Sequence, residues 1–268
     1  MKKWMAASRS ELEEEDARKR LAFALEHKDL TMEDWLHWIW SDEMYVRRMA
    51  GASRSQTWVF RPGPKTPARW KSAQHKYSRS RVYPRSKMRK EKVSVHMWGL
   101  FAGRRIGPLT RLHGDPGARK GGASSLKYLR LLKSWLPDLV RQFPRGSTVC
   151  FMQDGAGIHR GTLVRNWLSQ IQARGISGRT VKLVKWPPYS PDMNPIETVW
   201  AQVKSLFERL YPHLSDSKYQ DWALRIEIQD AIEHCWELLD SEYFENLARS
   251  MPARIKAVID AEGWYTRF

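Results

Sequence analysis

Three acidic residues stand where one predicted element gives way to the next. Asp42 follows the apolar run "LHWIWS", Asp154 ends the buried stretch "STVCFMQD", and Glu197 lies in the first turn of a helix that begins at "NPIE". In α/β sheets, ligands bind beyond the carboxyl ends of the strands. We therefore expect the two aspartates, at predicted strand ends, and the neighbouring glutamate to form one cluster.

A cluster of carboxylates predicts a site for divalent metal ions. Close carboxylates raise one another's pKa values unless a cation neutralises them, and hard oxygen ligands suit Mg²⁺ or Mn²⁺. Two such ions roughly 3.5–4 Å apart activate a water or a sugar hydroxyl and stabilise the leaving oxygen. The predicted cofactor is thus two Mg²⁺ or Mn²⁺ ions, and the predicted chemistry is cleavage or transfer of phosphodiesters.

Each acid taken alone has a simpler interpretation. A strand-end Asp is often a turn former, and a Glu in a first helical turn often compensates the helix dipole. Glu43 adjoins Asp42, and Asp192 fits the spacing of the third acid as well as Glu197 does. Only the joint arrangement favours a metal site. Zinc is not indicated, because His159 has no Cys or His partner at ligand spacing.

The stretch "WPPYSPDMNPIETVW", residues 186–200, leads into the helix of the third acid and contains four prolines. Asn194 is a suitable cap, and Pro195 fits the first helical position, where no N–H is needed. We expect this rigid segment to fix where the helix begins and so to place Glu197 against the two aspartates.

The net charge of +17 and the pI of about 10.0 predict a polyanionic partner. Nucleic acid is the first candidate and an anionic membrane surface the second. No apolar run approaches the roughly 20 residues that span a membrane. Two distant cysteines without metal-ligand spacing favour a reducing interior. We expect the nucleus if the chain is eukaryotic, and otherwise an intracellular location.

The stretch from 69 to 92 has ten Lys or Arg residues and one acid, so we interpret it as a basic loop that contacts DNA phosphates. A solvated loop or a nuclear-import signal is the alternative. His159 is a further candidate, near the phosphate or a metal-bound water, and its alternative is a helix-start residue with a local hydrogen bond. Lys204 lies two turns beyond Glu197, and its alternative is a solvated helix surface. The basic side chains that we expect to bind DNA are Arg79, Arg81, Arg85, Lys87, Arg89 and Lys90.

The elements that must position these residues alternate between helices and strands, which predicts a mixed α/β fold. Hydrophobic periodicity predicts strands near 36–41, 57–62, 92–101, 105–112, 147–154 and 180–186. Helices are predicted over 10–29, 121–143, 159–175 and 194–211, and over most of 216–260.

Three motifs resemble those that bear the acids of mariner-superfamily transposases. They are "WSDE" (40–43), "FMQDGAGIH" (151–159) and "WPPYSPDMNPIETVW" with a following Lys (186–204). The C-terminal "SMPARIKAVIDAEGWYTRF" resembles the end of that family's catalytic domain. The third motif is highly specific, the second moderately so, and the first is weak alone. The resemblance covers roughly residues 30–268, a DDE transposase catalytic domain, and leaves 1–29 as a helical lead-in or linker.

The resemblance implies a ribonuclease-H-like mixed sheet flanked by helices, with a two-metal site. By motif, Asp42 is the first acid, Asp154 the second and Glu197 the third, which leaves Asp192 a structural role in the turn. It also implies cut-and-paste transposition, in which water cleaves at the element ends and the freed 3′-OH attacks target DNA. The expected partners are double-stranded DNA, as transposon ends and target, and a second copy in a homodimer.

This chain departs from the family pattern in two places. Gly155 and Gly157 stand where family members often have Asn and Pro, so we expect a looser turn around Asp154. The family has paired helix-turn-helix units before the catalytic domain, whereas about 41 residues precede Asp42 here and predict one helix. The alternative function is therefore a catalytically decayed or repurposed DNA-binding protein derived from a transposase.

Overall fold

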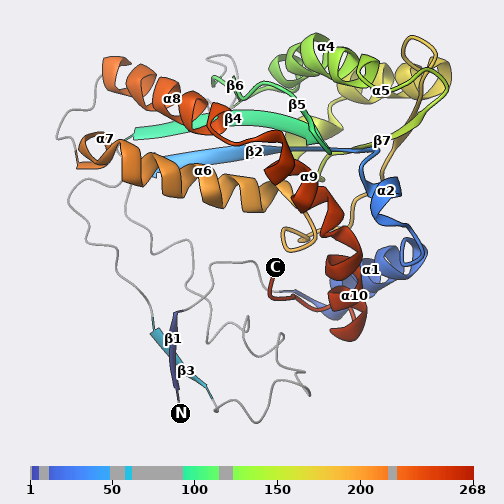
Figure 1. Cartoon of the computed structure of the whole chain (residues 1–268), viewed down its shortest axis with the longest axis horizontal. Helices are drawn as coiled ribbons and strands as arrows, with labels where there is room; N and C mark the ends of the chain where they lie inside the picture. The colour runs from blue at the N-terminus through green and yellow to red at the C-terminus, as the bar shows by residue number, and fades with distance from the viewer. Residues whose placement is uncertain (1, 6–11, 49–57, 62–92, 115–122, 217–221) are drawn as a thin grey trace.

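The protein is described by a computed structural model over residues 2–5, 12–48, 58–61, 93–114, 123–216 and 222–268 (Figure 1). The basic stretch 69–92, with its six predicted DNA-binding side chains, lies outside these ranges. So does Ser10, at the start of the first predicted helix; Glu13 and Asp16 cap that helix reciprocally instead. No helix among the described residues is long and apolar enough to cross a membrane.

A mixed sheet forms the centre of the molecule. Its strands follow the order β5-β4-β2-β7-β8, and β6 pairs with β4. β2 is antiparallel to β4 and parallel to β7, which is parallel to β8. The bounds are β2 Trp38–Arg48, β4 Val93–Ala102, β5 Arg105–Ile106, β6 Thr110–Arg111, β7 Thr148–Met152 and β8 Thr180–Leu183. A separate pair consists of β1 (Lys2–Met5) and β3 (Trp58–Arg61).

The prediction that the first strand ends at Asp42 was wrong. β2 continues to Arg48, because β4 pairs with it without interruption from Trp40 opposite Phe101 to Arg48 opposite Val93. The acidic pair therefore lies inside a paired strand, with Asp42 opposite Gly99.

Helices cover both faces of the sheet, so the predicted mixed α/β fold is confirmed. The predicted helices are all present, some divided into shorter ones. The observed helices are α1 Glu14–Glu26, α2 Met32–Trp35, α4 Ser125–Arg141, η3 Gly157–Arg160, α5 Thr162–Arg174, α6 Ile196–Leu210, α7 Pro212–Asp216, α8 Trp222–Glu237, α9 Ser241–Arg249 and α10 Met251–Asp260. Of these, α2 and α7 were not predicted.

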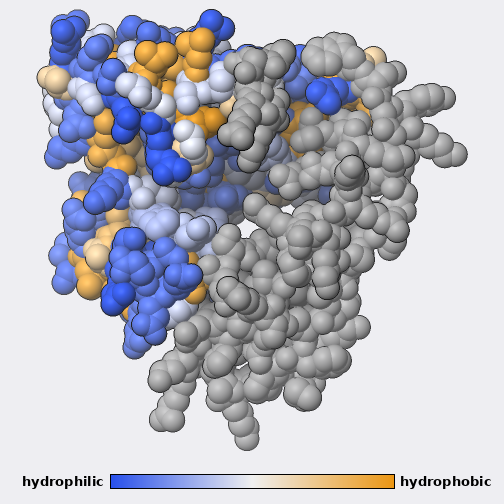
Figure 2. Space-filling view, turned by 180° about the vertical axis from the view of Figure 1, so that it is seen from behind, coloured by the Kyte–Doolittle hydropathy of each residue, from blue (hydrophilic) through white to orange (hydrophobic). Residues whose placement is uncertain are grey.

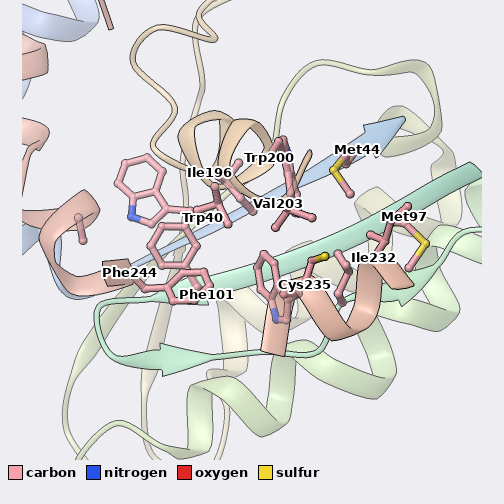
Figure 3. Packing of buried hydrophobic residues seen from close by; sticks show 14 of the residues in the cluster. Trp40, Met44, Met97, Phe101, Ile196, Trp200, Val203, Ile232, Cys235 and Phe244 are labelled. Carbon is pink, nitrogen blue, oxygen red and sulfur yellow. The ribbon is translucent and has the colours of Figure 1, made fainter. Parts of the chain in front are cut away.

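Two hydrophobic clusters hold these layers together. On one face, β2 and β4 pack against α6, α8 and α9, with side chains such as Trp40, Phe101, Trp200 and Phe244 in contact (Figure 3). On the other face, Ile39 and its neighbours pack against α4 and α5. α1 also belongs to the packed body, because Phe23 and Ala24 join the first cluster and the helix packs against α10.

Candidate active site

The pleat of β2 sends Asp42 and Glu43 to opposite faces of the sheet, because side chains alternate along a strand. Asp42 shares a face with Trp40 and Met44, which pack against α6. Its cross-strand partner Gly99 has no side chain, and a Cβ there would lie 2.9 Å from the Trp200 ring. Glu43 therefore points toward α4 and η3, and Asp42 points toward α6.

Two donors fix the carboxylate of Asp42. The backbone N–H of Glu43 donates to Oδ1 at 2.7 Å, and the side-chain amide of Asn194 donates to Oδ2 at 3.0 Å. Asn194 belongs to the lead-in of α6, so this bond ties the first acid to the segment that carries the third.

Asp154 lies two residues beyond the end of β7, in the turn that leads to η3. The strand thus ends at Met152, two residues earlier than predicted. Its Oδ1 accepts the backbone N–H of Ala156 at 2.8 Å and also lies 2.8 Å from Nδ1 of His159. The carboxylate is still 44% exposed, so it remains open to a ligand from outside.

His159 joins the second acid to the neighbour of the first. Its Nδ1 contacts Asp154, while its Nε2 lies 2.9 Å from Oε1 of Glu43. The ring is only 2% exposed and packs on Tyr128, with ring centroids 4.3 Å apart. This burial places the ring beneath the surface, where it binds carboxylates instead of facing a DNA phosphate.

The two carboxylates set the charge of His159. Burial by itself would lower the pKa of the imidazole, but the hydrogen bonds and charges of Asp154 and Glu43 outweigh it and raise the pKa to about 10. The ring is therefore an imidazolium at neutral pH, and both nitrogens donate. In return, this cation lowers the pKa of Asp154, although burial of that carboxyl acts in the opposite direction.

Glu197 lies in the first turn of α6 and its side chain is exposed. The helix begins one residue later than predicted: Pro195 is the cap, and Ile196 is the first helical residue. Asn194 makes only a long 3.4 Å bond to the Ile196 N–H, because its amide nitrogen is directed at Asp42. A difference of one residue is within the ordinary range for helix ends.

The electrostatics of Asp42 show that the acids lie together. Burial raises its pKa well above the ordinary value, and nearby carboxylates raise it further. These neighbours are Glu43, Glu197 and Asp154. A carboxyl with this environment is costly to ionise, and a bound cation would remove that cost.

The structure also places the remaining candidates. Lys204 is half-buried, two turns beyond Glu197 on α6, and its contact with DNA stays a prediction. Asp192 is fully buried, and both of its carboxylate oxygens accept hydrogen bonds from Arg20, so they are not available to a metal ion. This agrees with the structural role predicted for it.

Two features of the site were missed in the sequence. Asn194 was predicted only as a helix cap, and nothing in the spacing indicates its bond to Asp42. The Glu43–His159 contact joins residues 116 positions apart. The sequence did contain one signal for the contact between His159 and Asp154. The two residues are five positions apart, and one turn of chain over this interval brings the imidazole back to the carboxylate.

Comparisons with known proteins agree with this chemistry. The sequence family described as DDE superfamily endonuclease matches residues 130–217. The Tc1 transposase of Caenorhabditis elegans, which belongs to a transposable element, is 26% identical over 251 residues. The match covers 93% of this chain and 77% of that protein.

Solved structures of the Mos1 mariner transposase are similar to this chain. Its catalytic domain gives a TM-score of 0.59 at 15% identity, covering 98% of this chain and 100% of that one. Its paired-end complex with the left transposon end and its paired-end complex with Mn give 0.61 and 0.60 at 16% identity, covering 100% of this chain and 68% of each. At this identity the likeness shows the fold, and the predicted ribonuclease-H-like fold is confirmed.

Proposed function

We propose that this chain, which belongs to the mariner/Tc1 superfamily of DDE transposases, carries out the DNA cleavage and strand transfer of cut-and-paste transposition. The single observation that carries this function is the environment of Asp42, whose pKa is raised by burial and by three further carboxylates. Such a cluster suits a divalent cation and a phosphodiester substrate.

The residues present fit a divalent metal ion. All three assigned ligands offer carboxylate oxygens, and Asp154 and Glu197 are open to solvent. We assign Asp42, Asp154 and Glu197 as the metal-holding acids and propose two ions. When bound, Mg²⁺ or Mn²⁺ would activate the attacking oxygen and stabilise the leaving one.

A second donor set lies close by. One ligand atom each from Glu43, Asp154 and His159 falls within 4.8 Å of the others. We assign this set a supporting role instead, because both imidazole nitrogens already bind carboxylates and the ring is a cation at neutral pH. His159 thus holds Asp154 in place and leaves its exposed oxygen for the metal.

The proposed partners are the ends of a transposon and its target DNA. The net charge of +17 supports a polyanion, and the described part of the back surface is largely hydrophilic with small hydrophobic patches (Figure 2). The likeness to a paired-end complex supports a homodimer. We further propose a nuclear location in a eukaryotic host, and residues 30–268 as the catalytic domain.

A decayed or repurposed DNA-binding protein is the competing function. No observation on the described residues favours it, since all three acids are present and the supporting bonds to Asp42 and Asp154 are made.

The test is nicking of supercoiled plasmid, which does not require the element ends. Purified protein is incubated at low salt with Mn²⁺, Mg²⁺ or EDTA, beside Asp42→Asn, Asp154→Asn and Glu197→Gln. We expect metal-dependent nicking that falls by roughly 10³-fold in each variant, because several kcal/mol of transition-state stabilisation is at stake.

The matched control is Asp138→Asn, which removes an exposed carboxylate that pairs with Arg141 near the C-terminal end of α4. It should nick like the wild type. Binding of DNA in a gel shift with no nicking by any protein would support the repurposed DNA-binding function instead.

A further inference from the structure

We infer that the buried Arg20–Asp192 pair is a positioning device for the third acid, and that Arg20 sets how tightly the site binds its metal. Arg20 lies in α1, outside the three acid-bearing motifs and 172 positions before Asp192. This inference rests on the proposed function, since it concerns the orientation of Glu197 and Asn194 toward Asp42.

Arg20 binds the lead-in of α6 through both terminal nitrogens of its guanidinium. Nη1 and Nη2 donate to the two carboxylate oxygens of Asp192 at 2.8 and 2.7 Å, and Nη1 also donates to the carbonyl of Tyr189 at 2.9 Å. Both charged side chains are 0% exposed. A parallel two-bond pair of this kind fixes direction as well as distance.

The contact at Tyr189 shows that Arg20 holds an unusual backbone. Tyr189 has a φ of +50°, a left-handed conformation that bulky residues rarely adopt. Strain of this kind persists only where the surroundings determine it. The arginine on its carbonyl supplies one such restraint, six residues before the cap of the helix.

The C-terminal tail also binds the Arg20–Asp192 pair, and we call these joined contacts the clamp. Nε of Arg20 donates to the carbonyl of Gly263 at 2.7 Å, and the N–H of Thr266 donates to Asp192 at 2.8 Å. Gly263 has a φ of +86°, and a Cβ there would lie 1.9 Å from the carbonyl oxygen of Ala17 in α1. The tail is therefore pressed against α1, beside which α10 also lies in Figure 1.

A second buried arginine, Arg254, connects Asp192 to α6, the helix that contains Glu197. Arg254 of α10 donates from Nη1 to the backbone carbonyl of Asp192 at 2.9 Å, and from Nη2 to Oγ1 of Thr198 at 2.9 Å. Thr198 directly follows Glu197. Two residues after Asp192, Asn194 donates to Asp42. The clamp is thus connected to both sides of the proposed metal site.

Substitutions can separate a role of Arg20 in positioning the metal ligands from a role in stabilising the fold. A buried ion pair often contributes no more to stability than apolar residues of the same volume. Apolar replacements can therefore keep α1 packed on the lead-in while losing its directed bonds. Loss of those bonds should loosen the metal ligands even in a folded protein, because supporting hydrogen bonds orient metal ligands.

The experiment compares Arg20→Lys and the double variant Arg20→Met/Asp192→Leu with Val140→Ala. Val140 is buried on α4 in the opposite cluster, so its truncation lowers stability without touching the lead-in. Nicking is titrated with Mg²⁺ and Mn²⁺ and normalised to the folded fraction from circular dichroism. Mn²⁺ binding is measured separately by electron paramagnetic resonance.

We expect Arg20→Lys and the double variant to need about 10–100-fold more metal for half-maximal nicking and to bind Mn²⁺ correspondingly more weakly. Val140→Ala should keep the wild-type metal dependence. A wild-type metal dependence in both Arg20 variants would overturn the positioning role and leave the proposed function intact. A wild-type protein that neither binds Mn²⁺ nor nicks DNA would instead overturn the proposed function.

Discussion

The second and third acids of this protein are supported in opposite ways. Asp154 lies in a turn with two exposed glycines, and its main restraint is a histidine five residues away. Glu197 follows a proline-rich segment that is held by arginines from both ends of the chain. Support for the second acid is therefore local to its motif, whereas support for the third belongs to the whole fold.

Substitutions in the two supports should therefore have different effects on the site and on the stability of the fold. Damage to the local support should alter the site and leave most of the fold intact, because His159 has few partners outside it. Damage to the long-range support should unfold the protein and displace the site together, because α1, the lead-in of α6 and the tail meet at one buried ion pair.

The largest effect is expected from breaking the long-range support. Arg20→Met should lower the free energy of unfolding by about 3–5 kcal/mol, because the buried carboxylate of Asp192 loses its two hydrogen bonds to the guanidinium. Urea unfolding followed by tryptophan fluorescence measures this loss. The control is Arg18→Met on the same helix, where the ion pair is exposed and the midpoint should stay near wild type. Equal midpoints for the two variants would contradict the comparison.

A smaller loss of stability is expected from breaking the local support. His159→Gln should cost about 1–3 kcal/mol. Both N–H groups of the amide are on one nitrogen, so they do not reach the two carboxylates from two sides as Nδ1 and Nε2 do, and a buried acceptor loses its bond. Nicking should fall by about 10–100-fold, because His159 orients a proposed metal ligand. Exposed His213→Gln is the matched control. If stability falls and nicking per folded molecule does not, His159 has a structural role only.

The pH dependence of stability sharpens the same comparison. His159 has a folded pKa of about 10, raised from 6.5, so its contribution is full below pH 6.5 and is lost as the pH rises through about 10. In metal-free buffer, the difference in urea midpoint between wild type and His159→Gln should therefore shrink over this interval. The Arg20–Asp192 pair contains no imidazole, so the deficit of Arg20→Met should not follow the loss at His159. A constant His159 deficit would show that the imidazolium is not what holds the two carboxylates.

Much of this site was predictable because its motifs are local. The acids, the proline-rich lead-in and the five-residue step from Asp154 to His159 each lie within a few turns of chain. Sequence patterns report on such short intervals. The predicted order of helices and strands was confirmed for the same reason.

The remaining features depend on pairing across the sheet and on long-range packing. The end of β2 was misplaced because β4 pairs straight through the acidic residues, and polar residues in a strand resemble a strand end. The bonds of Arg20 and Arg254 to the lead-in were not predictable. An arginine in an amphipathic helix looks the same whether it meets water or a buried aspartate 172 positions away.

The smallest effect is expected at the glycines of the second motif. Neither Gly155 nor Gly157 has a positive φ, and a Cβ at either position would meet no atom within 4 Å among the described residues. Gly155→Ala should therefore raise the free energy of unfolding by about 0.4–1 kcal/mol by restricting the unfolded chain, and nicking should be unchanged. Gly263→Ala provides the contrast, because its Cβ would clash with α1 and its φ is +86°. If Gly155→Ala destabilised the protein or slowed nicking, the turn around Asp154 would need the freedom of glycine, and His159 would not be its main restraint.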